Sequence, residues 1–569
     1  MNLLKSIFFF ALFPAQILWS TVSVKDRMIA DLEIIKNAYE VCYAPAEWKK
    51  TFADWDLDVE FQKAKDQIDS IDYITTKDYQ RIVKHFLLST KDYHVSPLFH
   101  STEMSALPFR LQGAEGRYFV VQTNNKLRNY LEIPLQVGDE ILTFNHIPIH
   151  EAIQNFRRSE FGNPDSETDQ GMAEGFFTSR LGSLGHLVPQ GQCVITVKHK
   201  ANGATATYAP HWEYYPEQIE AAYNRRNNKG WIELEEDQPL SAHGFFTKKM
   251  STPYAVALKG MQELLGQEDR DMMGSALDIL CGNNQILWQA NSNFYKAYVY
   301  ETSKKQKIGY IRIPTYHATY AEAQEFAQLI AGYQVNTDAL IIDQQNNPGG
   351  YFFYMYAIAS MLTDKPLKVP LHKQTLTQED VAFALQYLNH IESIRNNYEA
   401  KQILGSTLQG YGVNFLVAQQ FKSHFHRIIE EWNLGSMITS PISLYGIDEI
   451  QPHPTARYTK PLLILINHMD FSCADFLPAI LQDNKRALLL GTKTAGAGGF
   501  ILKAAHPNRF GIASYSYTGS IAERLDHRPI ENLGVTPDIP YRMTANDLLN
   551  GYQDYHQALQ NAIDLILKK

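Results

Sequence analysis

The sequence predicts an α/β protein in which a layered core of strands and helices follows a helical N-terminal region and a small inserted β-domain. From about residue 295 onward, the apolar strands 307–313, 339–343 and 461–467 each precede a helical segment. A continuous apolar run is typical of a strand buried on both faces, and strands that alternate with helices favour a layered sheet. A chain of 569 residues exceeds one compact core, so about two to four domains are expected.

Residues 1–23 carry the pattern of a secretory signal peptide. Lys5 gives a positive start, residues 6–19 are apolar, and small residues precede the expected cleavage site near Ser23. The alternative, a buried N-terminal helix, fits Pro14 and the short apolar run less well. No later stretch is long and apolar enough to span a membrane, so the mature protein is expected to be secreted and to make no stable membrane insertion.

Two domains are expected to precede the core. Residues 24–105 form a helical region, in which apolar residues recur at helical spacing in 31–43 and 76–89. In residues 106–210, a strand, a Gly-Asp turn, a second strand, an Asn-His turn and a helix from His150 follow one another. This order resembles a PDZ domain, a module that binds peptide carboxylates. An unrelated small β-domain is the alternative.

Residues 211–290 are the least regular part of the sequence and are interpreted as a linker before the core, 291–569. Within the linker, 240–275 holds the apolar pieces Gly244–Phe246 and Tyr254–Leu258 among polar residues. Apolar side chains need a surface on which to bury, and a substrate crevice offers one. We expect 240–275 to be a self-inhibitory segment that blocks the site until it is cut, with permanent packing on the core as the alternative.

Composition and motif content argue against several classes of function. The formal net charge is −9, which leaves no surplus of Lys and Arg to bind nucleic acid. Cys42, Cys193, Cys281 and Cys473 are scattered without a CxxC pair, which disfavours a zinc site and leaves their disulfide state open. The sequence has neither HExxH nor GxSxG, and its glycine-rich stretch 494–499 fits no dinucleotide or phosphate loop. No metal or organic cofactor is expected.

Ser472 is the leading candidate nucleophile. The strand 461–467 ends, a short turn follows, and the serine stands at the start of a helix over 474–483. A side chain at such a position projects into a crevice, close to free backbone N–H groups that can bind an oxyanion. Local sequence by itself favours the commoner role of a helix N-cap. Cys473 is a second candidate, but one step further into the helix it is expected to point elsewhere.

Three other features can complete a catalytic site. Gly349 and Gly350 follow a buried strand, and paired glycines let the backbone approach a ligand and aim N–H groups outward, although a simple turn is the alternative. A serine also needs a base. Among 19 histidines, His94 stands out at the end of a helical segment, and Glu531 precedes a glycine turn near the end of the core.

These elements resemble the tail-specific, or C-terminal-processing, serine peptidases. Four family motifs occur in order. The first two are an NPGG loop after a strand ending in Asp, at 343–350, and a serine after a strand ending near Asn, at 467–475. The other two are a Gly-x-x-Thr-x-Gly loop at 491–499 and a Glu-x-x-Gly-Val-x-Pro-Asp ending at 531–538. The resemblance implies a crotonase-like α/β protease core. The usual family base is a lysine in the third loop, but Ala497 stands at that position, and Lys493 comes four residues early.

The absence of the lysine base is shared with one branch of the family, which this sequence resembles over nearly its whole mature length. Further shared stretches include 43–48, 92–94, 183–189, 311–316, 470–476 and 494–500. The resemblance implies a catalytic triad at Ser472, His94 and Glu531. For the proposed acyl transfer, backbone N–H groups near Gly349 and Gly350 and at Cys473 are expected to form the oxyanion hole. The resemblance also implies synthesis as a zymogen, activation by cleavage in the linker, a homodimeric active form, and release from an intracellular bacterium into the host cell.

The predicted function is that of a secreted serine endopeptidase that cleaves protein substrates, and host proteins by resemblance. A noncatalytic protein that holds a peptide or another ligand on the same fold is the rival of a different class. Loss of a triad residue would favour it, yet all three are present. A housekeeping protease that trims carboxyl tails is a weaker rival, because its lysine is missing.

Overall fold

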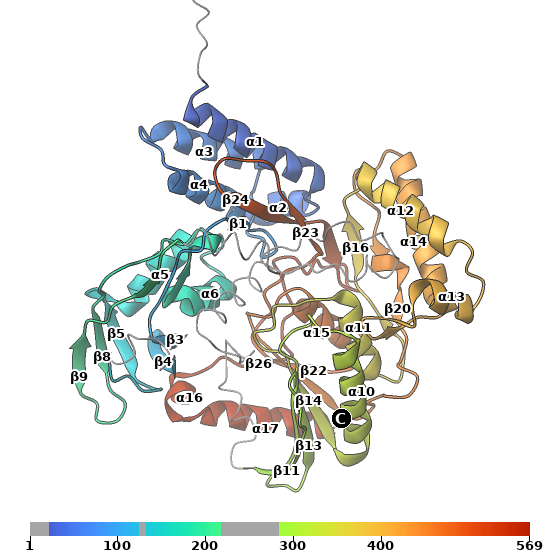
Figure 1. Ribbon diagram of the computed structural model, residues 1–569. Helices are drawn as coiled ribbons and strands as arrows, with labels where there is room; N and C mark the ends of the chain where they lie inside the picture. The colour runs from blue at the N-terminus through green and yellow to red at the C-terminus, as the bar shows by residue number, and fades with distance from the viewer. Residues whose placement is uncertain (1–21, 125–132, 218–283, 569) are drawn as a thin grey trace, which may run out of the picture.

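The structure is a computed structural model that describes residues 22–124, 133–217 and 284–568. The expected self-inhibitory segment 240–275 and nearly all of the expected signal peptide lie outside the described residues, as does Cys281. Over the described ranges, no helix has the length and apolar character needed to cross a membrane. Figure 1 shows the helical N-terminal region and the β-rich domain beside the larger core.

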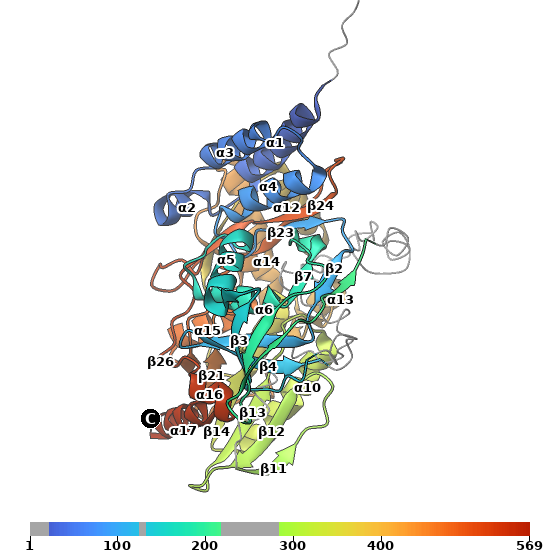
Figure 2. The same cartoon turned by 90° about the vertical axis from the view of Figure 1, so that its left-hand side faces the viewer.

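The N-terminal region is a layer of four helices that packs on a strand from the C-terminal part of the chain. The helices are α1 (Val24–Cys42), α2 (Ala46–Ala53), α3 (Leu57–Ser70) and α4 (Thr76–Leu88). Beyond α4, the short strand β1 pairs antiparallel with β24, which also pairs with β23. These strands are β1 (Pro97–Phe99), β23 (Ile501–Ala504) and β24 (Ile512–Thr518). Tyr39 and Tyr79 share one apolar cluster with Ile512, so the N-terminal helices lie against β24, a strand from the later part of the chain (Figures 1 and 2).

The next domain is an antiparallel sheet with two helices against it. Its main strands run in the order β3-β4-β5-β8-β9, with β6 at the side of β5. The elements are β3 (Phe109–Ala114), β4 (Arg117–Thr123), β5 (Glu140–Phe144), β6 (Ile147–Pro148), α5 (Ile149–Glu160), α6 (Glu167–Phe177), β8 (Ile195–Lys198) and β9 (Thr205–Tyr208). A separate small sheet holds β2 (Met104–Ala106), β7 (Ser179–Leu181) and β10 (Glu213–Tyr215). The helix expected from His150 is α5.

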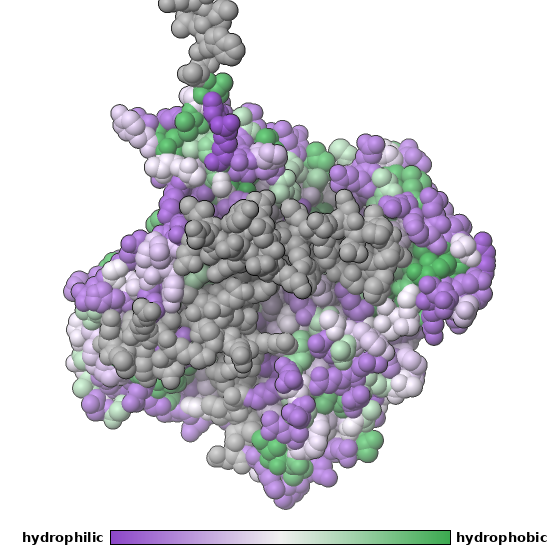
Figure 3. Space-filling view, viewed as in Figure 1, coloured by the Kyte–Doolittle hydropathy of each residue, from purple (hydrophilic) through white to green (hydrophobic). Residues whose placement is uncertain are grey.

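The core is built on a seven-stranded sheet with the order β11-β12-β13-β14-β21-β22-β26. The pairs β11–β12 and β12–β13 are antiparallel, whereas every pair from β13 to β26 is parallel. The strands are β11 (Gln285–Gln289), β12 (Lys296–Glu301), β13 (Lys307–Arg312), β14 (Ala339–Asp343), β21 (Leu462–Ile466), β22 (Leu488–Gly491) and β26 (Ile539–Pro540). The edge strand β11 exposes Ile286, Leu287 and Trp288, at the lower end of the view in Figure 3.

Helices cover both faces of the sheet, which explains the unbroken apolar strands in the sequence. Leu340 and Ile342 of β14 pack toward α10, α11 and α15, whereas Ile341 packs toward α17. These helices are α10 (Tyr320–Asn336), α11 (Phe352–Met361), α15 (Cys473–Asp483) and α17 (Gln553–Lys568). The predicted layered α/β core is therefore confirmed, and the observed ends of its strands and helices differ from the expected ends by a few residues.

One part of the core was not predicted. Three helices, drawn on the right of Figure 1, pack on one another, and Phe421 of the third contacts Phe353 of α11. They are α12 (Gln378–Ile391), α13 (Asn397–Leu404) and α14 (Phe415–Asn433). Short strands complete the core, among them β16 (Leu371–Gln374), β19 (Ile442–Ser443) and β25 (Ser520–Glu523). The short helix α16 (Ala545–Asn550) precedes α17.

Candidate active site

Ser472 stands between β21 and α15, and its backbone adopts a conformation that non-glycine residues rarely take. Its φ is 56° and its ψ is −116°, which costs about 1–3 kcal/mol. The residue is partly exposed, and its hydroxyl makes no hydrogen bond to any described residue. The local prediction of a hydrogen-bonding N-cap is therefore wrong. A strained serine with an unengaged hydroxyl is more typical of a catalytic turn than of a cap.

The turn before Ser472 is held by a buried carboxylate that ties two strand ends together. Asp470 accepts hydrogen bonds from the backbone N–H groups of Asn347 and Asn467, both at 3.1 Å, and from the side chain of Gln344 at 3.1 Å. Burial raises the pKa of Asp470 well above its usual value, while these donors lower it. Because the carboxyl ends of parallel strands meet at one edge, β14 and β21 place both loops together.

Gly349 and Gly350 lie where no side chain fits. A Cβ added to Gly349 would stand 2.7 Å from the carbonyl oxygen of Phe471 and 2.8 Å from Cβ of Ser472. A Cβ on Gly350 would stand 2.1 Å from backbone carbon of Tyr316. Both glycines also have positive φ, +85° and +151°, which favours glycine. The paired glycines therefore allow the two loops to touch beside the serine.

Gly349→Ala is expected to displace Ser472 and lower kcat/KM by about 100-fold, because a shift near 1 Å at reacting atoms has that effect. Gly332→Ala in α10 is the matched control, since its new Cβ would meet nothing within 4 Å. The measurement is hydrolysis of a quenched peptide by both variants, with circular dichroism to check the fold. Wild-type turnover by Gly349→Ala would contradict the close approach.

The three predicted oxyanion donors differ in their present partners. The N–H of Gly349 donates to Oδ1 of Asn347 at 2.8 Å, inside its own loop. The N–H of Cys473 has no acceptor in any other described residue, whereas the N–H of Gly350 faces the thiol of Cys473 and lowers the pKa of that thiol. Of the three predicted donors, the amide of Cys473 is therefore the one without an acceptor among the other described residues, and Gly349 supplies the close backbone approach.

Cys473 is not placed as a nucleophile. Its side chain is fully buried, and its thiol donates to the carbonyl of Gly350 at 3.3 Å. Burial raises the pKa of the thiol well above its usual value. A buried thiol without thiolate character is inert as a nucleophile. Cys42, Cys193 and Cys473 form no disulfide with one another in the described part of the chain.

His94 lies in the loop between α4 and β1 and is completely buried. Its backbone is fixed at both ends: its N–H donates to Oδ1 of Asp92 at 2.8 Å, and its carbonyl accepts from the hydroxyl of Ser516 at 2.6 Å. Neither ring nitrogen has a hydrogen-bond partner among the described residues. Burial lowers the pKa of the imidazole to about 4, against the attraction of Asp92. At neutral pH, the ring is therefore an uncharged base with two free nitrogens.

Glu531 is also completely buried, between two donors. The N–H of Gly498 donates to its Oε2 at 3.0 Å, and the ammonium of Lys49 pairs with its Oε1. Burial and the nearby charge of Asp92 raise the pKa of Glu531 to about 7, while Lys49 lowers it. A carboxyl group whose pKa is raised in this way by burial and a neighbouring charge is common at functional sites.

Residues beside the predicted triad members contact one another. The rings of Tyr93 and Phe471 pack edge to face, with centroids 5.9 Å apart. The side-chain amide of Asn532 donates to the carbonyl of Lys91 at 2.6 Å. The loop that carries the histidine therefore lies between the turn of the serine and the segment of the glutamate, although these segments are far apart in sequence.

Two residues that sequence reasoning missed complete this arrangement. Asp475, in the first turn of α15, accepts from the hydroxyl of Thr494 at 2.5 Å and from the N–H groups of Gly496 and Ala497 at 2.8 and 3.0 Å. It thereby fixes the loop that leads to the Gly498 donor. The second residue is Lys49. The signal for Asp475 was its place three residues after the serine, but nothing in the local sequence around Lys49 indicates a partner.

Lys493 does not replace the missing lysine base in this structure. Its side chain is exposed, and its ammonium lies 3.5 Å from the carbonyl oxygen of Asn532. His468, another alternative base, approaches the hydroxyl of Thr492 at 3.2 Å and has its pKa lowered by burial to about 4. Of these groups, only the histidine of the α4–β1 loop has both ring nitrogens buried without a partner.

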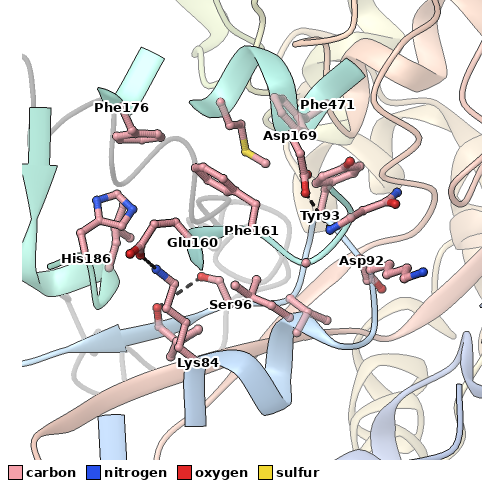
Figure 4. Close-up of a pocket in the computed structure, with 18 residues that line it drawn as sticks. Lys84, Asp92, Tyr93, Ser96, Glu160, Phe161, Asp169, Phe176, His186 and Phe471 are labelled. Atoms are coloured by element: carbon pink, nitrogen blue, oxygen red, sulfur yellow. Dashed lines mark hydrogen bonds and ion pairs between the residues drawn. The ribbon is translucent and has the colours of Figure 1, made fainter. Parts of the chain in front are cut away.

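A pocket lies beside Asp92 and Tyr93 of the histidine loop, and its walls come from α4, this loop and the β-rich domain (Figure 4). Figure 4 shows Lys84 and Glu160 pointing toward one another, and Nζ and Oε2 are 2.5 Å apart. Tyr93 and Phe471 line the same pocket. The residues adjacent to the histidine and the serine thus form part of its wall.

Comparisons with known proteins agree with this architecture. The model of peptidase family S41 matches residues 307–541, and a PDZ domain model matches residues 103–219. The PDZ-like assignment is therefore confirmed. A carboxyl-terminal-processing protease of Synechocystis sp. is 32% identical over 108 residues, which cover 19% of this chain and 25% of the relative.

Longer matches extend over nearly the whole chain. An uncharacterized protein of Chlamydia muridarum is 34% identical over 566 residues, covering 95% of this chain and 93% of the relative. The solved structure of mature CPAF, the chlamydial protease-like activity factor, in complex with lactacystin is 31% identical, with a TM-score of 0.81 and coverage of 96% of this chain and 99% of that chain. A mutant CPAF structure gives a TM-score of 0.85 at 31% identity. The chain is a peptidase that belongs to family S41 and, within it, to the CPAF branch.

Proposed function

We propose that the protein is a serine endopeptidase in which Ser472 is the nucleophile, His94 the general base and Glu531 the residue that stabilises the imidazolium. The observation that carries the proposal is the strained, partly exposed serine, whose hydroxyl is unengaged beside two glycines. His94 takes the proton of the hydroxyl as the oxygen attacks a peptide carbonyl, and it then donates a proton to the leaving amine.

The environment of His94 supports the role of a base. Since burial holds its pKa near 4, the imidazole is neutral at pH 7 and can accept a proton. In the reaction, one nitrogen must face the serine and the other must donate to a carboxylate. The two ring nitrogens without partners among the described residues supply this capacity. A charged Glu531 would offset the unfavourable burial of the imidazolium.

The tetrahedral intermediate needs donors for its oxyanion. The backbone N–H groups of Gly350 and Cys473 are proposed for this role, because the Cys473 amide has no acceptor in another described residue and the Gly350 amide faces only a weakly accepting thiol. Gly349 contributes by letting its loop approach the nucleophile. Loss of one such donor typically lowers kcat by about 100- to 1,000-fold.

A fluorophosphonate probe tests the proposal against the rival of a noncatalytic peptide-binding protein. Wild type should be labelled covalently, whereas Ser472→Ala should not, with unchanged circular dichroism. Absence of label on folded, proteolytically activated wild type, together with stable peptide binding, would favour the noncatalytic rival. Cleavage restricted to carboxyl tails rather than internal bonds would favour the tail-processing rival.

We extend the proposal to the life cycle of the enzyme. The sequence pattern of residues 1–23 supports secretion. Host-cell proteins as substrates, synthesis as a zymogen and a homodimeric active form are proposed from the family resemblance of the sequence. Size measurement in solution tests the dimer. Transfer of residues 1–23 to a reporter protein tests export.

Activation by cleavage is expected within residues 240–275, which lie outside the described residues. Purified Ser472→Ala protein should remain uncut, because it cannot process itself. A trace of active enzyme should then cut it within this segment, where Lys248, Lys249 and the acidic stretch 268–271 are polar. Mass spectrometry identifies the cut, and wild-type activity should rise with it. An uncut wild-type chain with full activity would contradict the zymogen proposal.

A further inference from the structure

The carboxylate of Glu531 is paired with a buried lysine that belongs to the N-terminal region. Lys49 lies in α2, and its side chain is 0% exposed. Its ammonium contacts Oε1 of Glu531, Oδ1 of Asn532 at 2.6 Å and the carbonyl oxygen of Lys91 at 3.3 Å. An ammonium has three protons to donate, so three acceptors satisfy it fully. Removing one partner of such a buried pair leaves an uncompensated charge, which is strongly destabilising.

The groups that face Glu531 come from several elements. Lys49 of α2 and the N–H of Gly498 favour its charged form, whereas Asp92, in the loop after α4, disfavours it. Asp92 is itself bound by the hydroxyl of Tyr43 at 2.9 Å. His94 stands two residues after Asp92 and has a neutral ring at pH 7. Lys49 is therefore the positive side chain that counters both burial and the neighbouring carboxylate.

The same lysine also reaches the histidine loop. Asn532 accepts from Lys49 and donates to the carbonyl of Lys91, which itself lies within reach of the ammonium. One buried ammonium thus connects the segment of Glu531 to the loop of His94. Movement of Lys49 would change both the charge of the carboxylate and its position relative to the imidazole.

We propose that Lys49 is a positioning residue of the peptidase, which favours the ionised form of Glu531 and aligns its carboxylate so that it can stabilise the imidazolium of His94. The inference rests on the proposed Ser-His-Glu mechanism. Lys49 touches neither the serine nor the expected position of the substrate, and it acts through Glu531. Lys49 is not the lysine base of the family, because that position is Ala497 in this chain. Its contact with Glu531 places Lys49 to support the carboxylate rather than to deprotonate the serine.

The test is the pH dependence of kcat/KM for Lys49→Met, which removes the charge at similar length, and Lys49→Arg, which keeps it. At pH 7, Lys49→Met should lose about 100-fold in kcat with little change in KM. Loss of the lysine raises the pKa of Glu531 and also removes a charge that lowers the pKa of His94, so the acid limb of the profile should move upward by about one pH unit or more. The same substitution in the Glu531→Gln background separates the two causes, because only the effect on His94 remains there. Activity should partly return near pH 9, and Lys49→Arg should retain the wild-type limb.

Lys84→Met is the matched control. Lys84 is also buried and paired with a buried carboxylate, Glu160, at 2.5 Å. Its removal breaks a comparable ion pair away from Glu531, so stability should fall while the acid limb stays in place. If Lys49→Met lost the same fraction of activity at every pH, as a purely structural defect would, the positioning role would be rejected.

A double variant keeps the test decisive if Lys49→Met does not fold. Lys49→Met combined with Glu531→Gln leaves no unpaired buried charge. If Lys49 acts through Glu531, the double variant should be at least as active as Glu531→Gln alone, and lower activity would overturn the inference. Fluorophosphonate labelling of wild type separates the two levels: unlabelled wild type refutes the proposed function, whereas labelled wild type with a normal Lys49→Met profile refutes only the role of Lys49.

Discussion

Ser472→Ala is expected to lower kcat by about 10⁴- to 10⁶-fold, because loss of a triad nucleophile leaves only the catalysis that comes from binding and the oxyanion donors. The hydroxyl of Ser472 makes no hydrogen bond to a described residue. Its removal should therefore change the free energy of unfolding by no more than about 0.5 kcal/mol. Hydrolysis of an internally quenched peptide measures kcat, and thermal unfolding measures stability.

The matched control for this prediction is Ser70→Ala at the exposed end of α3, whose hydroxyl makes only a local hydrogen bond. It should cleave at the wild-type rate. Near-normal turnover by Ser472→Ala would show that another residue is the nucleophile. Cys473 would then have to be examined, despite its burial and its raised pKa.

His94→Ala is expected to be nearly as damaging, with a loss of about 10⁴-fold or more in kcat, because the serine and its base act as one unit. For the same reason, adding Ser472→Ala should lower the rate little further. Glu531→Gln should be milder, since the base remains while its orientation and the stabilisation of its charged form weaken. Single-turnover kinetics with the quenched peptide measures all of these variants.

The control for the histidine is His186→Ala. His186 is also a buried histidine whose pKa is lowered by burial, but it lies at the β-rich domain. It tests the general effect of removing a buried imidazole, so its kcat should stay far closer to wild type. Normal cleavage by His94→Ala would exclude the proposed base, and Lys493 or His468 would be tested next.

The sequence was sufficient for the fold class and for the local elements around the nucleophile. Apolar runs in the sequence predict the strands β13, β14 and β21, because burial on both faces of a parallel sheet favours apolar residues at successive positions. The place of Ser472 between β21 and α15 follows from the same pattern. In contrast, α12, α13 and α14 were missed because no motif marked that part of the chain.

Local sequence could not assign the role of Ser472. An N-cap and a nucleophile both stand at the start of a helix, and only the backbone angles and the absence of a cap hydrogen bond distinguish them. It also could not pair His94 with a serine 378 positions later along the chain. The family resemblance suggested that pairing, but residues alone gave no reason for it.

What the sequence determined by itself is the set of elements and their order, since these depend on short-range periodicity and turn residues. Only the tertiary structure decided which side chains face one another. The pairing of β1 with β24 draws the α4–β1 loop to the C-terminal segment, and this contact brings Lys49 of α2 to Glu531. The charge state of that carboxyl group depends on burial and on Asp92 and Lys49, and electrostatic interactions depend on distances in space that the order of residues does not specify.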